Sequence, residues 1–155
     1  MQQKRKNNLG IIGWVCGGRY GADRYAYALH RLTGLGILCY FLMHIFVTGR
    51  RLGADGPDKW TQAMEFFQNT VICGLPVFVI GEFLVFLAFI FHAINGIRLI
   101  FVELGLLVGK PGLPAYPYSY STLRQRPVLV GALCVVALLV GVAGADFVHH
   151  LWFVE

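Results

Sequence analysis

The chain has 155 residues, of which 57% are hydrophobic and only 14% are charged. A soluble domain of this length carries far more charge, so the composition argues against a soluble protein and favours one that is integral to the membrane. The net charge of +5 does not indicate nucleic-acid binding, because the basic N-terminal segment is short and adjoins a membrane span.

Three apolar segments are long enough to cross a bilayer, and we expect spans at residues 26–48, 71–104 and 126–148. Each meets the requirement of about 18 to 25 residues for a helix that crosses a hydrocarbon core of about 30 Å. The sequence therefore predicts an all-α integral membrane fold in a single domain of residues 1–155.

The segments between the spans differ in character. The lead-in, residues 1–24, is basic and has aromatic residues suited to the headgroup level. In the first loop Trp60, Met64 and Phe67 recur at helical spacing, which predicts a short amphipathic helix at the membrane interface. The second loop, residues 110–127, is rich in Pro and Tyr, so we expect it to be irregular and to dock on a partner.

The third span has no charged residue in its central part, residues 128–145. We assign it a packing role, because glycines in a membrane helix allow a second helix to approach closely. The glycines concerned are Gly131, Gly141 and Gly144.

The distribution of basic residues predicts the orientation. They gather before the first span and after the second, whereas the loop between these spans has fewer. Cytoplasmic loops carry the excess of Lys and Arg, so we expect a cytoplasmic N-terminus and a C-terminus on the outer side. The two basic groups are Lys4, Arg5, Lys6, Arg19 and Arg24, and Lys110, Arg124 and Arg126.

The stretch FHAINGIRLIFVELG, which begins at Phe91, places polar residues inside the second span. An imidazole in lipid needs a hydrogen-bond partner or a metal. His92 shares one helix face with Ala88 and Gly96, and these small neighbours leave room for a flat group such as a porphyrin. The alternative is a histidine that is hydrogen-bonded to a neighbouring helix, and the spacing does not separate the two. Arg98 is a candidate for fixing polar groups at the membrane edge, by snorkelling to the cytoplasmic surface.

The HRLTG motif that begins at His30, followed a span later by FHAINGIRLIFVELG, resembles the cytochrome b membrane-anchor subunit of succinate dehydrogenase and fumarate reductase, respiratory complex II. That family has an H-R-x-[ST]-G element at the first span and an H-x-x-x-G-[IM]-R element in the second. The resemblance covers about residues 27–105. It implies an anchor that passes electrons through haem b between an iron–sulfur subunit and a membrane quinone, with no succinate chemistry of its own.

The resemblance also implies roles for individual residues. His92 matches the axial haem ligand. His30 and Arg31 match residues at the cytoplasmic membrane edge, near the haem propionates and the quinone pocket. The sequence departs from the family where many members have a serine three residues before the His-Arg pair; here only Ala28 and the phenol of Tyr27, a further quinone candidate, are nearby. It departs again at Leu99, where many members have a histidine.

His44 is a second candidate for haem iron. It follows Gly34 by ten residues, the spacing at which the two-haem members that this chain resembles carry a first-span ligand. Helical rise separates His44 from His92 by on the order of 15 to 20 Å along the membrane normal. One haem cannot use both residues, but two stacked haems can use one each. The alternative is a packed core histidine.

Two acids are candidates for handling protons. Glu65 resembles in position an acid that two-haem members keep beside the distal haem, where menaquinol gives up protons; the alternative is a solvated surface glutamate. Glu82 lies inside the second span, where an ionised carboxyl is costly. It is expected to act as a proton relay or to be protonated and hydrogen-bonded.

The expected cofactor is haem b, with either two haems or one, and the favoured quinone is menaquinone by family analogy. Flavin and iron–sulfur motifs are absent, so FAD and the clusters are expected on flavoprotein and iron–sulfur partner subunits. Three helices cannot enclose a haem, so we expect a second membrane-anchor subunit. The expected location is the prokaryotic plasma membrane rather than the mitochondrial inner membrane. The rival function is a haem-free scaffold in another membrane complex or transporter.

Overall fold

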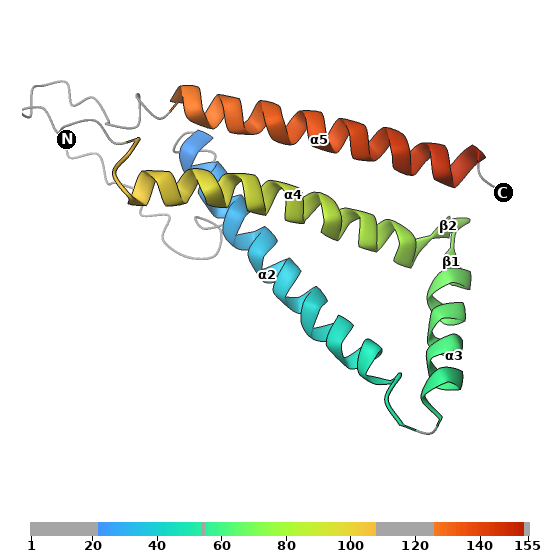
Figure 1. The fold of residues 1–155 in the computed structure, drawn as a ribbon. Helices are drawn as coiled ribbons and strands as arrows, with labels where there is room; N and C mark the ends of the chain where they lie inside the picture. Colours follow the sequence, from blue (N-terminus) through green and yellow to red (C-terminus); the bar gives the residue numbers. More distant parts are fainter. Residues whose placement is uncertain (1–21, 54, 108–125, 154–155) are drawn as a thin grey trace, which may run out of the picture.

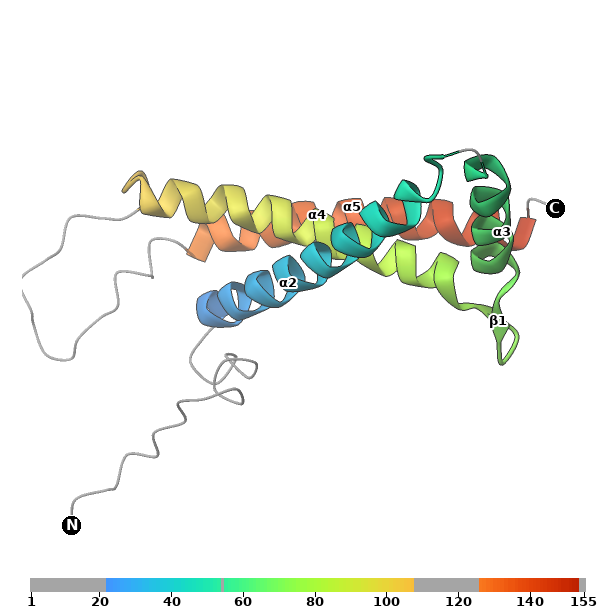
Figure 2. The same ribbon diagram turned by 90° about the horizontal axis from the view of Figure 1, so that it is seen from below.

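The structure is a computed structural model that describes residues 22–53, 55–107 and 126–153. The predictions for the basic lead-in and for the loop rich in Pro and Tyr fall almost entirely outside these residues. The elements in chain order are α2 (Ala22–Gly49), α3 (Gly56–Asn69), β1 (Val71–Ile72), β2 (Leu75–Pro76), α4 (Val77–Glu103) and α5 (Arg126–Phe153). Three long helices, α2, α4 and α5, make up most of the described chain (Figures 1 and 2).

The three long helices have the dimensions of membrane spans. They contain 28, 27 and 28 residues, which corresponds to about 40 Å at a rise of about 1.5 Å per residue. Only 6% of the most apolar window of each helix is buried within the chain. A helix of a soluble protein buries its apolar side, whereas these leave most apolar side chains for lipid or other subunits to cover. The predicted all-α membrane class is confirmed.

Helix α4 contacts both of the other long helices. It crosses α2 near His30 and His92, in the first half of α2 and the second half of α4, and the two helices then diverge toward α3 (Figure 1). It meets α5 along a seam in which Phe83 stacks on Phe147, with ring centroids 4.1 Å apart and an interplanar angle of 8°. The limited packed interior therefore lies at the α2–α4 crossing and along the α4–α5 seam.

The predicted amphipathic helix in the first loop is α3. It begins with Pro57 in its first turn, where proline fits because the missing N–H would have no helical partner. Ala63 is buried, and the ring of Phe67 meets that of Phe78 on α4 edge to face, with centroids 4.8 Å apart. The apolar side of α3 therefore packs against the start of α4.

The second span begins later than the sequence predicts. Residues 71–76, which were expected to be helical, form a hairpin in which Val71 pairs with Pro76. Cys73 and Gly74 make its turn with φ values of 52° and 78°, and a helix cannot pass through this left-handed backbone. Helix α4 therefore starts at Val77.

The glycines of the third span do not make the close helix contacts that the sequence predicts. A Cβ placed on Gly131, Gly141 or Gly144 would meet no heavy atom of the described chain within 4 Å. The prediction is wrong for contacts among the described residues, where large side chains such as Phe83 and Phe147 pack in the α4–α5 seam.

The hairpin gives a test of local strain. Left-handed backbone costs an ordinary residue roughly 1–2 kcal/mol, and asparagine followed by glycine is favoured in such two-residue turns. We expect Cys73→Asn to raise the free energy of unfolding by about 1 kcal/mol and Cys73→Val, which adds a β-branch, to lower it. Thermal unfolding in detergent measures both. Equal melting temperatures for the two variants would contradict the assigned turn.

Candidate functional site

Two histidines meet at the α2–α4 crossing. The rings of His30 and His92 are stacked, with centroids 3.9 Å apart and an interplanar angle of 9°. Each ring also lies against a glycine of the opposite helix: a Cβ on Gly34 would come within 2.8 Å of His92 Cε1, and a Cβ on Gly96 within 3.2 Å of His30 Cε1. The sequence predicts space for a flat group beside Gly96, and in the structure the imidazole of His30 occupies that space.

The surroundings of His92 determine which ring nitrogen carries the proton. Its Nδ1 lies 3.0 Å from the main-chain carbonyl oxygen of His30 and 3.3 Å from Thr33 Oγ1. A carbonyl oxygen can only accept a hydrogen bond, so Nδ1 must be the protonated nitrogen. Nε2 then keeps the lone pair with which a neutral imidazole binds a metal. The alternative of a hydrogen bond to a neighbouring helix therefore holds for Nδ1, and it leaves Nε2 chemically able to bind a metal.

A buried polar cluster lies beside the histidine pair. Arg98 and Asn95 are only 4% and 2% exposed. Arg98 Nε donates to Asn95 Oδ1 over 3.0 Å, and its Nη1 lies 3.6 Å from Asp23 Oδ1 on α2. Asn95 Nδ2 donates to the carbonyl oxygen of Ala26 over 3.4 Å. The prediction that Arg98 snorkels to the surface is wrong, because a carboxylate of the neighbouring helix lies within reach inside the bundle.

Sequence reasoning missed Asp23 and Thr33 as members of this site. A signal was available, because Asp23, Ala26, His30 and Thr33 recur every three or four residues and so share one helix face. That face of α2 is the one that packs against α4, as the contacts of its members with His92, Asn95 and Arg98 show.

Two quinone candidates lie together on the exposed surface of α2. Arg31 Nη2 donates to the hydroxyl oxygen of Tyr27 over 2.7 Å, and its guanidinium carbon lies 4.4 Å from the centre of the Tyr27 ring. A guanidinium has five N–H donors, so most remain available for a carbonyl or carboxylate.

The other three candidates lie away from this pair. His44 follows His30 by fourteen positions on α2, which is about 21 Å along the axis, and its ring lies 5.7 Å from that of Tyr40. Glu65 on α3 and Glu82 on α4 are, like His44, exposed. None of the three contacts the His30–His92 pair in the part of the chain that the structure describes.

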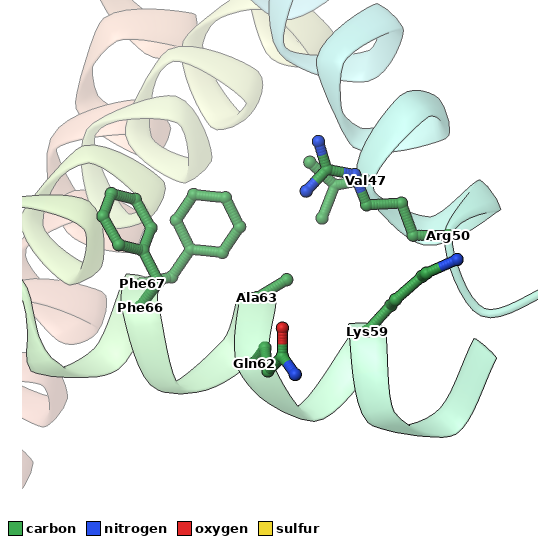
Figure 3. A pocket seen from close by; sticks show the side chains of 7 residues that line it. All are labelled: Val47, Arg50, Lys59, Gln62, Ala63, Phe66 and Phe67. Atoms are coloured by element: carbon green, nitrogen blue, oxygen red, sulfur yellow. The ribbon is translucent and has the colours of Figure 1, made fainter. Parts of the chain in front are cut away.

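A pocket lies between the end of α2 and α3, where Phe66 and Phe67 form one end and the basic residues Arg50 and Lys59 the other (Figure 3). Its remaining lining residues are Val47, Gln62 and Ala63. No predicted site residue lines it, Glu65 included. We therefore place the candidate chemistry at the α2–α4 crossing.

The fold and the site define an all-α, multi-pass membrane subunit with a metal-competent histidine at a helix crossing. Residues 2–141 match the model of the succinate dehydrogenase/fumarate reductase transmembrane subunit family. The chain is also 30% identical, over 127 residues, to the succinate dehydrogenase hydrophobic membrane anchor subunit of Halobacterium salinarum, with 81% of this chain and 85% of that protein covered. No solved structure shows a significant match. The chain belongs to the succinate dehydrogenase/fumarate reductase transmembrane subunit family.

The reciprocal histidine–glycine packing gives a stability test. A methyl group on Gly34 would come 2.8 Å from His92, whereas one on Gly36 of the same helix would meet nothing within 4 Å. We expect Gly34→Ala to destabilise the fold by about 1 to 3 kcal/mol through overpacking. Gly36→Ala should stabilise it by roughly 0.5–1 kcal/mol, because glycine is a poor helix former. Melting temperatures in detergent that shift in the same direction would contradict this packing.

The ion pair between the buried Arg98 and the half-buried Asp23 gives a second test. Asp23→Asn leaves the Arg98 guanidinium without its counter-charge, and we expect a loss of stability on the order of 3 kcal/mol. The single variants Asp23→Asn and Arg98→Met and their combination form a double-mutant cycle, read by unfolding in detergent. The double variant should lose less than the sum of the single losses. Additive losses would show that the two side chains are not coupled.

Proposed function

We propose that this chain is a haem b-carrying membrane anchor of a succinate:quinone oxidoreductase, which passes electrons between an iron–sulfur subunit and a membrane quinone. The observation that carries the proposal is the 3.0 Å contact between His92 Nδ1 and the His30 carbonyl oxygen. Metal-ligating histidines usually donate their other ring N–H to a carbonyl or carboxylate, which fixes the tautomer and orientation. His92 is held in this way, with Nε2 left for iron.

The single free imidazole nitrogen of His92 suits a haem better than a bare metal ion. Within residues 22–53, 55–107 and 126–153, no three or more His, Cys, Asp and Glu side chains gather where they could hold a metal. A porphyrin brings four nitrogen ligands of its own, so it needs only axial ligands from protein. His92 would supply one, and a second membrane-anchor subunit would supply the other. The bound haem would contribute reversible one-electron chemistry.

The residues at the start of α2 are proposed to bind the quinone and the edge of the haem. Arg31 and Tyr27 are exposed and already joined by a hydrogen bond, so they present a preorganised donor pair to a quinone carbonyl or a propionate. His30 holds the axial ligand through its carbonyl oxygen and its stacked ring. Arg98, paired with Asp23, is assigned to holding α2 against α4.

We propose His44 as a ligand of a second haem near the outer face. Its position, about 21 Å along α2 from His30, is too far for it to share a haem with His92, and its exposure leaves it open to a partner helix. Quinol oxidation there would release protons, which need an acceptor within hydrogen-bond reach. Glu65 and Glu82 are the proposed acceptors, and menaquinone is the proposed quinone.

The remaining partners follow from the family. An anchor of succinate dehydrogenase or fumarate reductase assembles with catalytic subunits. We assign FAD to a flavoprotein partner and the clusters to an iron–sulfur partner seated on the cytoplasmic side, in the prokaryotic plasma membrane. Support for a further membrane subunit comes from the 6% burial of the three spans.

Haem content of the purified complex tests these assignments. A pyridine haemochrome assay of the wild type should give two haems per anchor. We expect His92→Ala to remove the inner haem, because it takes away the imidazole whose Nε2 is free at the α2–α4 crossing. His44→Ala should remove the outer haem and leave the midpoint potential of the inner one unchanged.

His150→Ala is the matched control, since His150 is exposed beyond the packed core and lies 3.7 Å from Asp146 on its own helix. It should keep both haems. Full haem content in His92→Ala would reject His92 as a ligand. A single haem in the wild type would reject the outer site alone, and the absence of reducible b-type bands would reject the haem-carrying function.

A further inference from the structure

We propose that Thr33 is a positioning residue for His92. Its hydroxyl oxygen and the carbonyl oxygen of His30 together accept the Nδ1–H of the imidazole, and through this bond Thr33 sets the basicity of Nε2 and the midpoint potential of the inner haem. The inference rests on the proposed role of His92 as an axial ligand.

The direction of the hydrogen bonds follows from counting protons. Thr33 Oγ1 lies 2.9 Å from the carbonyl oxygen of Leu29 and 3.0 Å from that of His30. A hydroxyl has one proton, and both carbonyls can only accept, so this proton stays directed at the backbone of α2. The lone pairs of Oγ1 are then left to face His92 Nδ1 at 3.3 Å. Thr33 is therefore an acceptor from His92.

The same contacts select one orientation of the ring. The imidazole of His92 is held flat against His30 at 3.9 Å, and its edge lies where Gly34 leaves no room for a Cβ. These contacts fix the plane of the ring but not which edge faces α2. A ring turned by half a rotation would place a carbon where Nδ1 now lies and would lose both hydrogen bonds. The acceptors on α2 therefore decide where Nε2 points.

An acceptor on the distal N–H makes a ligating imidazole more basic, and a more basic ligand favours ferric over ferrous iron. Thr33→Val keeps the shape and the β-branch of the side chain but removes the acceptor. The His30 carbonyl remains, so the tautomer persists while the donation from Nε2 weakens. The expected result is a haem that is retained but easier to reduce.

Thr48 provides a matched control on the same helix. Its hydroxyl makes the same kind of backbone contacts, 2.7 Å from the carbonyl oxygen of His44 and 3.3 Å from that of Ile45. Such contacts are common for Thr within helices. Thr48 is about 22 Å along the axis from Thr33, so Thr48→Val removes an equivalent backbone contact far from His92.

The test is a spectroscopic redox titration of the complete complex, following the haem that His92→Ala removes. In Thr33→Val we expect that haem to be retained and its ferrous form to be favoured about tenfold, an upward shift of about 59 mV for a one-electron couple. Thr33→Ser keeps the hydroxyl and should titrate close to wild type, as should Thr48→Val.

An unchanged potential in Thr33→Val with full haem content would overturn the inference and leave the proposed function standing. An equal shift in Thr48→Val would also overturn it, because the effect would then belong to the helix backbone. If Thr33→Val loses the haem, the Thr33→Ser variant distinguishes the explanations. Retention of the haem in Thr33→Ser would support the role of the hydroxyl, and loss of the haem in both variants would overturn it. A wild-type complex without b-type haem would instead overturn the proposed function.

Discussion

The hydrogen bond from His92 Nδ1 to the main-chain carbonyl of His30, 3.0 Å long, is the contact on which the site depends. Inside a bilayer no water satisfies an imidazole N–H, so an unpaired one is costly. The carbonyl of His30 has a second lone pair beyond the one used by the helix and accepts without disrupting α2. The bond satisfies one nitrogen of the ring, leaves the lone pair of the other nitrogen available to a metal, and joins α2 to α4.

The close approach that this bond requires comes from matched spacing on the two helices. Each has a histidine four positions before a glycine, and each glycine accommodates the imidazole of the other helix. The ion pair between the buried Arg98 and the half-buried Asp23 continues the same antiparallel register toward the start of α2. Polar contacts thus hold α2 to α4 at one end of the bundle, where the proposed inner haem and quinone site lie.

The opposite end of the bundle is organised differently. Beyond the crossing, α2 and α4 diverge, and α3 lies between their far ends (Figure 1). His44, Glu65 and Glu82 are exposed there, and the glycines of α5 meet nothing in the described chain. The subunit is therefore packed against itself at the α2–α4 crossing and leaves most of its remaining surface for a partner subunit or lipid to cover.

The sequence by itself determined the membrane class, the three spans and the amphipathic α3, because a backbone in lipid must satisfy its own hydrogen bonds and apolar length then specifies helices. It also singled out His92, since a lone imidazole in an apolar span needs a partner. Tertiary structure alone decided what that partner is. His30 and His92 are 62 positions apart in sequence, and the nearly uniform apolar surfaces of the two helices do not encode their register. The spacing of Asp23, Ala26, His30 and Thr33 in the sequence shows that they share one face of α2. It does not show which residues of α4 that face meets, so the burial of Arg98 against Asp23 and the contact of Thr33 with His92 emerged only once the helices were packed.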